Sequence, residues 1–248
     1  MIAHLGMYDR PETAAANDRF WAGIRDALGH GPDALTRDGD FWEIWRSPDL
    51  LLSQTCGMPY RTKLHGEVAL VGTPDYGLTG CPPGYYCSVF VAHRDRAGSA
   101  LRDFDGQAFA YNEDLSQSGW AAPQTHMAAE GVRHGSLLQT GGHALSAQAV
   151  ADRQADFAAL DALTWDLIQE HDDFAKDLIE LARTEPTPTL PFITALSHDA
   201  APLRDAIRTA IQNLSKEDRR LLRLQDLVEI PAETYLAIPT PPAPGSTV

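Results

Sequence analysis

The stretch that decides the fold is Ala110-Tyr111-Asn112-Glu113-Asp114-Leu115-Ser116-Gln117-Ser118-Gly119-Trp120. Residues 107–111 are expected to form a strand, and a helix is expected to begin near Ser118 after a short polar turn. The first turn of a helix has N–H groups without intrahelical partners, and the peptide dipoles add about half a positive charge there. We therefore interpret residues 116–119 as a small anion cradle that needs no Lys or Arg. The alternative is an ordinary N-cap, because Ser is a favoured capping residue.

Three other polar segments also follow apolar runs of strand length. They are residues 55–60, residues 140–143 and Asp161. Ligands of open α/β sheets bind beyond the carboxyl ends of the strands. We therefore expect these segments to converge with the cradle. Their hydroxyls, one imidazole, one carboxylate and aromatic rings suit a small oxyanion that keeps a proton or carries an amine.

Strands alternate with helices along most of the chain, which predicts an α/β fold with mixed, mostly parallel sheets. Two breaks divide the chain, one near residues 86–91 and one at residues 184–191, which hold three prolines and are expected to form no regular element. The predicted domains are a discontinuous lobe of residues 1–88 plus 191–238, a second lobe of residues 89–190, and a loose Pro-rich tail of residues 239–248. Two crossings between lobes predict a hinge and a ligand cleft between the lobes.

The net charge and the hydropathy of the chain limit the kinds of partner that it is expected to bind. The 248 residues include 34 Asp and Glu against 20 Lys and Arg, for a formal net charge of −14. Such a surface repels nucleic acid and anionic membranes, so neither is expected as a partner. No window reaches the roughly 18 apolar residues of a membrane span, so no direct membrane insertion is expected. The N-terminal residues show no basic segment followed by a long apolar run, so no secretory signal is expected in the sequence as given.

The three cysteines, Cys56, Cys81 and Cys87, are too few for a disulfide scaffold. Three separate thiols are the favoured interpretation, and pairing of Cys81 with Cys87 stays open. An enzyme is the alternative function, with Cys56 as nucleophile, His143 as base and Asp161 orienting the imidazole. No local nucleophile signature surrounds Cys56. No His-x-x-x-His or Cys-x-x-Cys pair is present, so no metal or cofactor is expected.

Several of these segments together resemble a known family. In order and spacing, the chain from residue 2 to residue 214 is similar to the phosphate, phosphite and phosphonate substrate-binding proteins of ABC importers. The Ser-x-Ser-Gly turn and the Gly-His turn are the most specific pieces of the resemblance. The segments that carry it are residues 57–60, 86–89, 112–119, 140–143 and 155–161.

The resemblance implies a type II periplasmic-binding-protein fold that captures a small phosphonate-like or phosphate-like oxyanion between two lobes. It implies an ABC transporter permease as partner, no catalysis, a monomer and a periplasmic location, with a cytoplasmic small-molecule sensor as the other option. The ligand-binding residues that it implies are Tyr60, Tyr86, Ser116, Gln117, Ser118, His143 and Asp161. Asp156 is the rival of Asp161.

Each of these residues also has an interpretation without a ligand. His143 could be an ordinary surface histidine, Asp161 a plain N-cap, and Tyr60 and Tyr86 core aromatics. Gln117 departs from the family, which has a smaller hydroxyl residue in the middle of the turn. An amide offers different donors and more bulk, so this position bears on phosphonate specificity.

Overall fold

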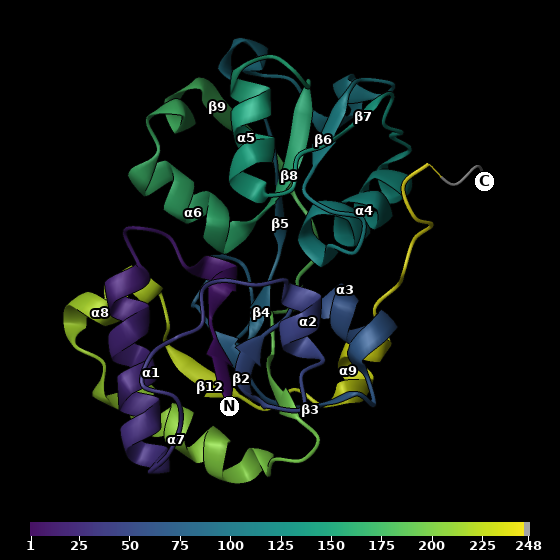
Figure 1. Ribbon diagram of the computed structural model, residues 1–248. Helices are drawn as coiled ribbons and strands as arrows, with labels where there is room; N and C mark the ends of the chain where they lie inside the picture. Colours follow the sequence, from purple (N-terminus) through teal and green to yellow (C-terminus); the bar gives the residue numbers. More distant parts are fainter. Residues whose placement is uncertain (246–248) are drawn as a thin grey trace. The chain divides into compact units, whose positions relative to one another are not determined.

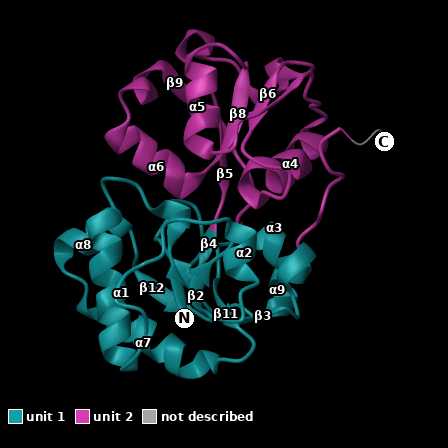
Figure 2. Cartoon of the chain, viewed as in Figure 1, with its two compact units in different colours: residues 1–85, 188–237 teal, residues 86–187, 238–248 magenta. Residues whose placement is uncertain are grey.

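The computed structural model describes residues 1–245, which form two compact units (Figure 2). Unit 1 comprises residues 1–85 and 188–237, and unit 2 comprises residues 86–187 and 238–245 of the described chain. The sequence predicts lobe boundaries between residues 88 and 89 and between residues 190 and 191. These boundaries stay a prediction.

Unit 1 is built on a five-stranded sheet of order β1-β2-β11-β3-β12. Figure 1 labels three of these strands, β2, β3 and β12. β1 is parallel to β2, whereas β11 is antiparallel to both β2 and β3, and β12 is antiparallel to β3. Its elements are β1 (Ile2–His4), η1 (Gly6–Tyr8), α1 (Ala14–Leu28), α2 (Phe41–Trp45), β2 (Leu50–Gln54), α3 (Gly57–Pro59), η2 (Tyr60–Leu64), β3 (Val68–Asp75), β11 (Phe192–Ala195), α7 (Ala200–Asn213), α8 (Lys216–Leu222), β12 (Asp226–Val228) and α9 (Ala232–Leu236).

Helices cover both faces of this sheet. α1 and α7 pack against each other, and α7 also packs on β3. α1 turns Phe20, Trp21 and Ile24 inward at helical spacing, so its apolar stripe is buried. On the other face, Trp45 of α2 and Tyr60 of η2 belong to one hydrophobic cluster together with α9. The sheet is therefore the middle layer of unit 1.

Unit 2 is built on a second five-stranded sheet, of order β7-β6-β8-β5-β9. β6 is parallel to β7 and β8, and β5 runs antiparallel to β8 and β9. Its elements are β5 (Ser88–His93), η3 (Arg94–Arg96), η4 (Leu101–Phe104), β6 (Phe109–Tyr111), η5 (Gln117–Ala121), α4 (Ala122–Glu130), β7 (Leu137–Gln139), α5 (His143–Ala151), β8 (Phe157–Asp161), α6 (Ala162–His171), η6 (Asp173–Asp177) and β9 (Leu178–Arg183).

The first helix begins at Ala14, after a turn in which the Thr13 hydroxyl donates to the Tyr8 carbonyl and accepts from the Arg10 N–H. The structure differs from the sequence expectations in two places. The proline-rich segment does contain a short strand, β10 (Thr187–Pro188), which pairs with β4 (Tyr85–Tyr86) at the unit boundaries. The tail expected to be loose has an anchor, because Pro242 accepts a hydrogen bond from Trp120.

The predicted fold class is confirmed, with two mixed sheets in which most strands run in one direction. Apolar side chains fill the central strands, and Val89, Phe90 and Val91 of β5 are completely buried. Over residues 1–245, no disulfide joins any of the three cysteines. The described part of the chain has no helix long and apolar enough to span a membrane.

Candidate functional site

The polar segments of unit 2 meet at one edge of its sheet. The parallel strands β6, β7 and β8 all end there, and the antiparallel strand β5 begins there, with Ser88 paired to Asp161. We call this the β6–β8 edge. η5, which contains most of the cradle, follows β6 and packs against β8.

The cradle is shaped by an unusually wide helical turn. The carbonyl of Ser116 accepts from the N–H of Ala121, five residues on, at 2.9 Å and from that of Trp120 at 3.2 Å. The Ser116 side chain caps the same turn, because its Oγ accepts from the N–H of Gly119 at 2.9 Å. Single π-type turns of this kind are rare and occur frequently at functional sites.

A second turn is hydrogen-bonded to the first. The N–H groups of Thr140 and Gly141, which follow β7, donate to the carbonyls of Tyr111 and Asn112 at 2.9 Å each. α5 begins immediately afterwards at His143, and His143 Nε2 lies 2.9 Å from Ser118 Oγ. The structure therefore brings the Ser-Gln-Ser-Gly turn and the Gly-Gly-His turn into direct contact.

His143 is a neutral imidazole at pH 7. Burial lowers the pKa of His143 to about 4, and the backbone carbonyl of Ala159 offsets this effect only in part. A neutral ring has one donor and one acceptor nitrogen. The pair formed with Ser118 can therefore present a hydroxyl donor or a hydroxyl acceptor to a bound molecule, depending on the tautomer.

Two buried side-chain oxygens at the β6–β8 edge lack a hydrogen-bond partner among the described residues. They are Ser88 Oγ and Asn112 Oδ1. Buried polar groups are nearly always hydrogen-bonded, so such a cluster calls for an explanation, and a bound molecule is one. Neither Ser88 nor the Asn112 side chain is among the ligand-binding residues expected from the sequence. The only signal was a hydroxyl at the start of an otherwise apolar strand, and an amide directly after another.

The two candidate aspartates lie at opposite ends of β8. Asp161 ends the strand at the β6–β8 edge, is 2% exposed, and caps α6 by accepting from the Thr164 N–H at 3.0 Å. Asp156 precedes the strand, and its carboxylate accepts from the Ala108 N–H at 2.9 Å. Of the two, only Asp161 lies at the edge that carries Ser118 and His143.

The remaining candidates are placed differently. Gln117 is buried, and its Nε2 lies 3.5 Å from Thr187 Oγ1, on the side of a cavity next to α4. Tyr86 is buried at the first residue of unit 2. Tyr60 belongs to unit 1, where it packs edge-on against His65 and Tyr235. Burial, reinforced by Glu233, raises the pKa of Tyr60 to about 12.

The residues of the alternative sites are placed as follows. Cys56 is a buried thiol of unit 1, and the Nε2 atom of His143 contacts the Ser118 hydroxyl within unit 2. Among residues 1–245, no cluster of three or more His, Cys, Asp or Glu side chains is arranged to hold a metal ion.

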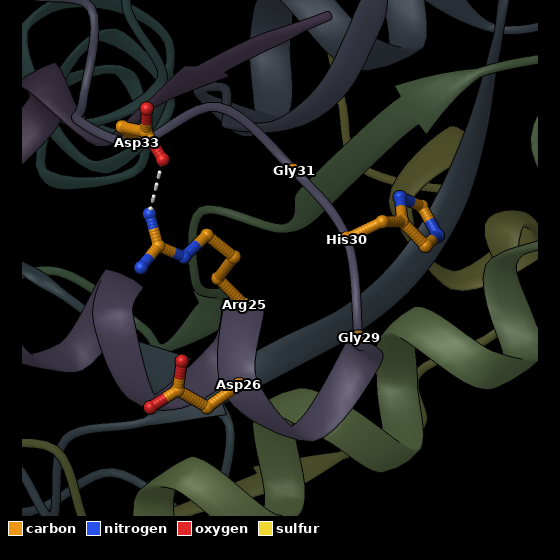
Figure 3. Close-up of a pocket in the computed structure, with 6 residues that line it drawn as sticks. All are labelled: Arg25, Asp26, Gly29, His30, Gly31 and Asp33. Carbon is orange, nitrogen blue, oxygen red and sulfur yellow. Dashed lines mark hydrogen bonds and ion pairs between the residues drawn. The ribbon is translucent and has the colours of Figure 1, made fainter.

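Unit 1 has a shallow depression of about 450 Å³ beyond the end of α1 (Figure 3). Its Arg25 guanidinium points to Asp33 and forms an ion pair at 2.9 Å, and Asp26 adds a second carboxylate. The cation is therefore already neutralised, and the depression contains none of the candidate ligand residues. An oxyanion would gain little there.

Comparison with known proteins identifies the family. Residues 54–232 match the family model described as "ABC transporter, phosphonate, periplasmic substrate-binding protein". The chain belongs to this family. The match includes the cradle, His143 and Asp161. No curated protein sequence matches the chain.

Solved structures show that the fold is the type II periplasmic-binding-protein fold. PhnD1 from Prochlorococcus marinus, solved with methylphosphonate, aligns with a TM-score of 0.73 at 13% identity over 94% of each chain. A phosphonate ABC transporter binding protein from Pseudomonas aeruginosa aligns with a TM-score of 0.70 at 14% identity, over 96% of this chain and 84% of the other. A Xanthomonas citri protein solved with ATP aligns at 0.67 and 16% identity, over 94% and 92%.

Proposed function

We propose that this member of the phosphonate-binding family captures a small phosphorus oxyanion, a phosphonate or phosphate-like solute, and delivers it to an ABC transporter permease from the periplasm. Ser116 and Ser118 hold the oxyanion together with the backbone N–H groups of the cradle. His143 supports Ser118, and Asp161 accepts a proton or amine hydrogen of the ligand. Tyr60, Tyr86 and Gln117 complete the proposed site.

The observation that carries this proposal is the 2.9 Å contact between Ser118 Oγ and His143 Nε2. It joins the two turns that carry the family resemblance, at the carboxyl ends of parallel strands where α/β proteins bind ligands. Ser88 and Asn112 add unpartnered buried oxygens to the same edge.

The chemistry of the proposed site favours an anion of low net charge. The proposed residues include no Lys or Arg, and the imidazole is neutral. Hydroxyls and helix-terminal N–H groups stabilise an anion by hydrogen bonds, which contribute about 1.5–3 kcal/mol each when one partner is charged. Asp161 repels a full dianion and accepts from a P–OH or an ammonium group. A monoprotonated or zwitterionic phosphorus oxyanion therefore fits best.

A thermal-shift screen tests the proposal. The panel is methylphosphonate, aminoalkylphosphonates, phosphate, phosphite and sulfate, with amino acids as negative controls. A ligand at about 100 times its Kd stabilises the folded state by about 2.7 kcal/mol. We expect a shift with at least one phosphorus oxyanion, recovered unchanged afterwards. No shift with any of them, or consumption of the compound, would overturn the proposal.

A further inference from the structure

The C-terminal segment, residues 238–245, is the feature of unit 2 that the proposed function does not use. It contains four prolines, at positions 239, 241, 242 and 244. Such a sequence favours a stiff, extended conformation over a random coil. The chain leaves α9 at Ala237 in unit 1 and then joins unit 2, so this segment is a third passage of the chain between the units.

The segment is anchored at the residue that follows the cradle. The indole N–H of Trp120 donates to the carbonyl of Pro242 at 2.9 Å. Trp120 is 3% exposed, and its ring packs against Tyr111 and His134 with centroid distances of 5.1 and 5.7 Å. A buried indole N–H needs a partner, and the segment supplies it.

The start of the same segment adjoins the other side of the cradle. Ile238 and Pro239 line a cavity of about 300 Å³ together with Gln117, the second residue of the cradle. Thr187 lines this cavity too, and Gln117 Nε2 lies 3.5 Å from its Oγ1. The C-terminal segment thus lies next to Gln117, which belongs to the cradle, and next to Trp120, which follows the cradle.

We propose that residues 238–245 form a strap that holds the turn from Ser116 to Ala121 in its anion-binding conformation. The turn is a single π-type turn, a conformation that short segments seldom keep without tertiary support. Without the strap, the turn samples other conformations, and the apparent affinity falls in proportion to the competent fraction. Because the segment continues from α9, the strap also connects unit 1 to the cradle by covalent bonds.

The test compares a chain ending at Ala237 with a matched control chain ending at Gly245, which keeps the whole strap. Hydrogen exchange of the backbone amides of residues 116–122 measures the rigidity of the turn, and isothermal titration with methylphosphonate measures affinity. In the chain ending at Ala237 we expect exchange at least about tenfold faster and an affinity about tenfold weaker, with the amides of β8 unchanged. Unchanged exchange, or an affinity within about twofold of the control, would overturn the strap.

A second variant covers the case in which the shortened chain does not fold. Replacing the four prolines with glycine, as Pro239→Gly, Pro241→Gly, Pro242→Gly and Pro244→Gly, keeps the length and the carbonyl of residue 242 but removes the stiffness. This variant should show faster exchange at residues 116–122 and weaker binding of methylphosphonate, each to a smaller degree than the chain ending at Ala237. Exchange and affinity equal to those of the wild type would contradict the strap. The affinity measurement rests on the proposed function: if the control chain binds neither methylphosphonate nor any other phosphorus oxyanion, that function is in error, and the exchange measurement still decides the strap.

Discussion

At the scale of single residues, Gly119 shows how tightly the cradle is packed. A Cβ at this position would lie 1.8 Å from Asn112 Oδ1 and 3.2 Å from Ser116 Oγ. The first distance is far below any real contact, so the amide of Asn112 occupies the space that every other residue type would need. The close approach of strand end and turn therefore depends on a glycine.

Gly119→Ala should destabilise the fold by about 1–3 kcal/mol, as overpacking of a well-filled site does. It should also weaken oxyanion binding, because the turn and Asn112 must move apart. The matched control is Gly142→Ala, at the same edge, where the added Cβ meets only Leu145 at 3.9 Å. Urea unfolding of both variants gives the comparison, and equal losses in the two would show that the contact is not tight.

The lowered pKa of His143 predicts that the stability of the folded state depends on pH. The unfolded chain protonates this ring near pH 6.5 and the folded chain only near pH 4, so the unfolded state binds more protons between these values. The associated stability is fully present above pH 6.5 and is lost as the pH falls toward 4, by at most about 3 kcal/mol.

The measurement is the free energy of unfolding at about pH 7 and about pH 5 for the wild type and His143→Gln. The variant should lose less stability than the wild type over this interval. His4, whose pKa is also lowered by burial, is common to both and cancels in the comparison. The same pH slope in both proteins would rule out a buried neutral His143.

At the scale of elements, the two serines of the wide turn from Ser116 to Ala121 have different contacts. The Ser116 side chain caps the turn, whereas the Ser118 side chain contacts His143. Ser116 Oγ accepts the Gly119 N–H, so Ser116→Ala should cost about 1 kcal/mol of stability, as N-cap removal does. Ser118→Ala leaves that cap intact but removes the partner of His143 Nε2, so it should cost about 1–3 kcal/mol. Thermal unfolding of the two variants measures both losses, and unchanged stability in Ser116→Ala would show that Ser116 is not the cap.

Local signals in the sequence were sufficient for most elements of unit 2. The apolar runs ending in polar turns indicated β6, β7 and β8, and the structure places all three in one sheet. Asp161 and Asp156 could not be separated, because both flank the same strand and only the direction of that strand decides which lies at the β6–β8 edge.

Elements that depend on distant partners were not predicted. β11 follows a proline-rich segment and pairs with β2 and β3, and β12 adds to β3 from near the end of the chain. Such pairings are set by tertiary packing rather than by local sequence. The anchoring of the C-terminal segment was missed for the same reason, since the Trp120 to Pro242 hydrogen bond joins residues 122 positions apart.

At the scale of the whole molecule, the charge of −14 opposes the proposed ligand. The field around the protein repels an anion, and binding has to come from donors within a few ångströms of it. Added salt screens that repulsion, because the Debye length shrinks to about 8 Å at physiological ionic strength.

The affinity for a phosphorus oxyanion should therefore hold steady or rise between about 20 mM and about 200 mM KCl. A site built on clustered Lys and Arg would show the opposite trend. Isothermal titration at the two salt concentrations distinguishes them. A tenfold loss of affinity at the higher salt would mean that long-range attraction to a basic patch holds the anion, and the cradle would not be the site.

The most direct test of the central claim is a calorimetric titration of methylphosphonate into the wild-type protein, Ser118→Ala and the exposed-site control Ser197→Ala. We expect saturable binding of one ligand per chain to the wild type and the control. Ser118→Ala should bind about tenfold or more weakly, which corresponds to the loss of one charge-assisted hydrogen bond. Equal affinity in all three proteins would place the ligand elsewhere, and no binding to the wild type by methylphosphonate or any other phosphorus oxyanion would contradict the proposed function.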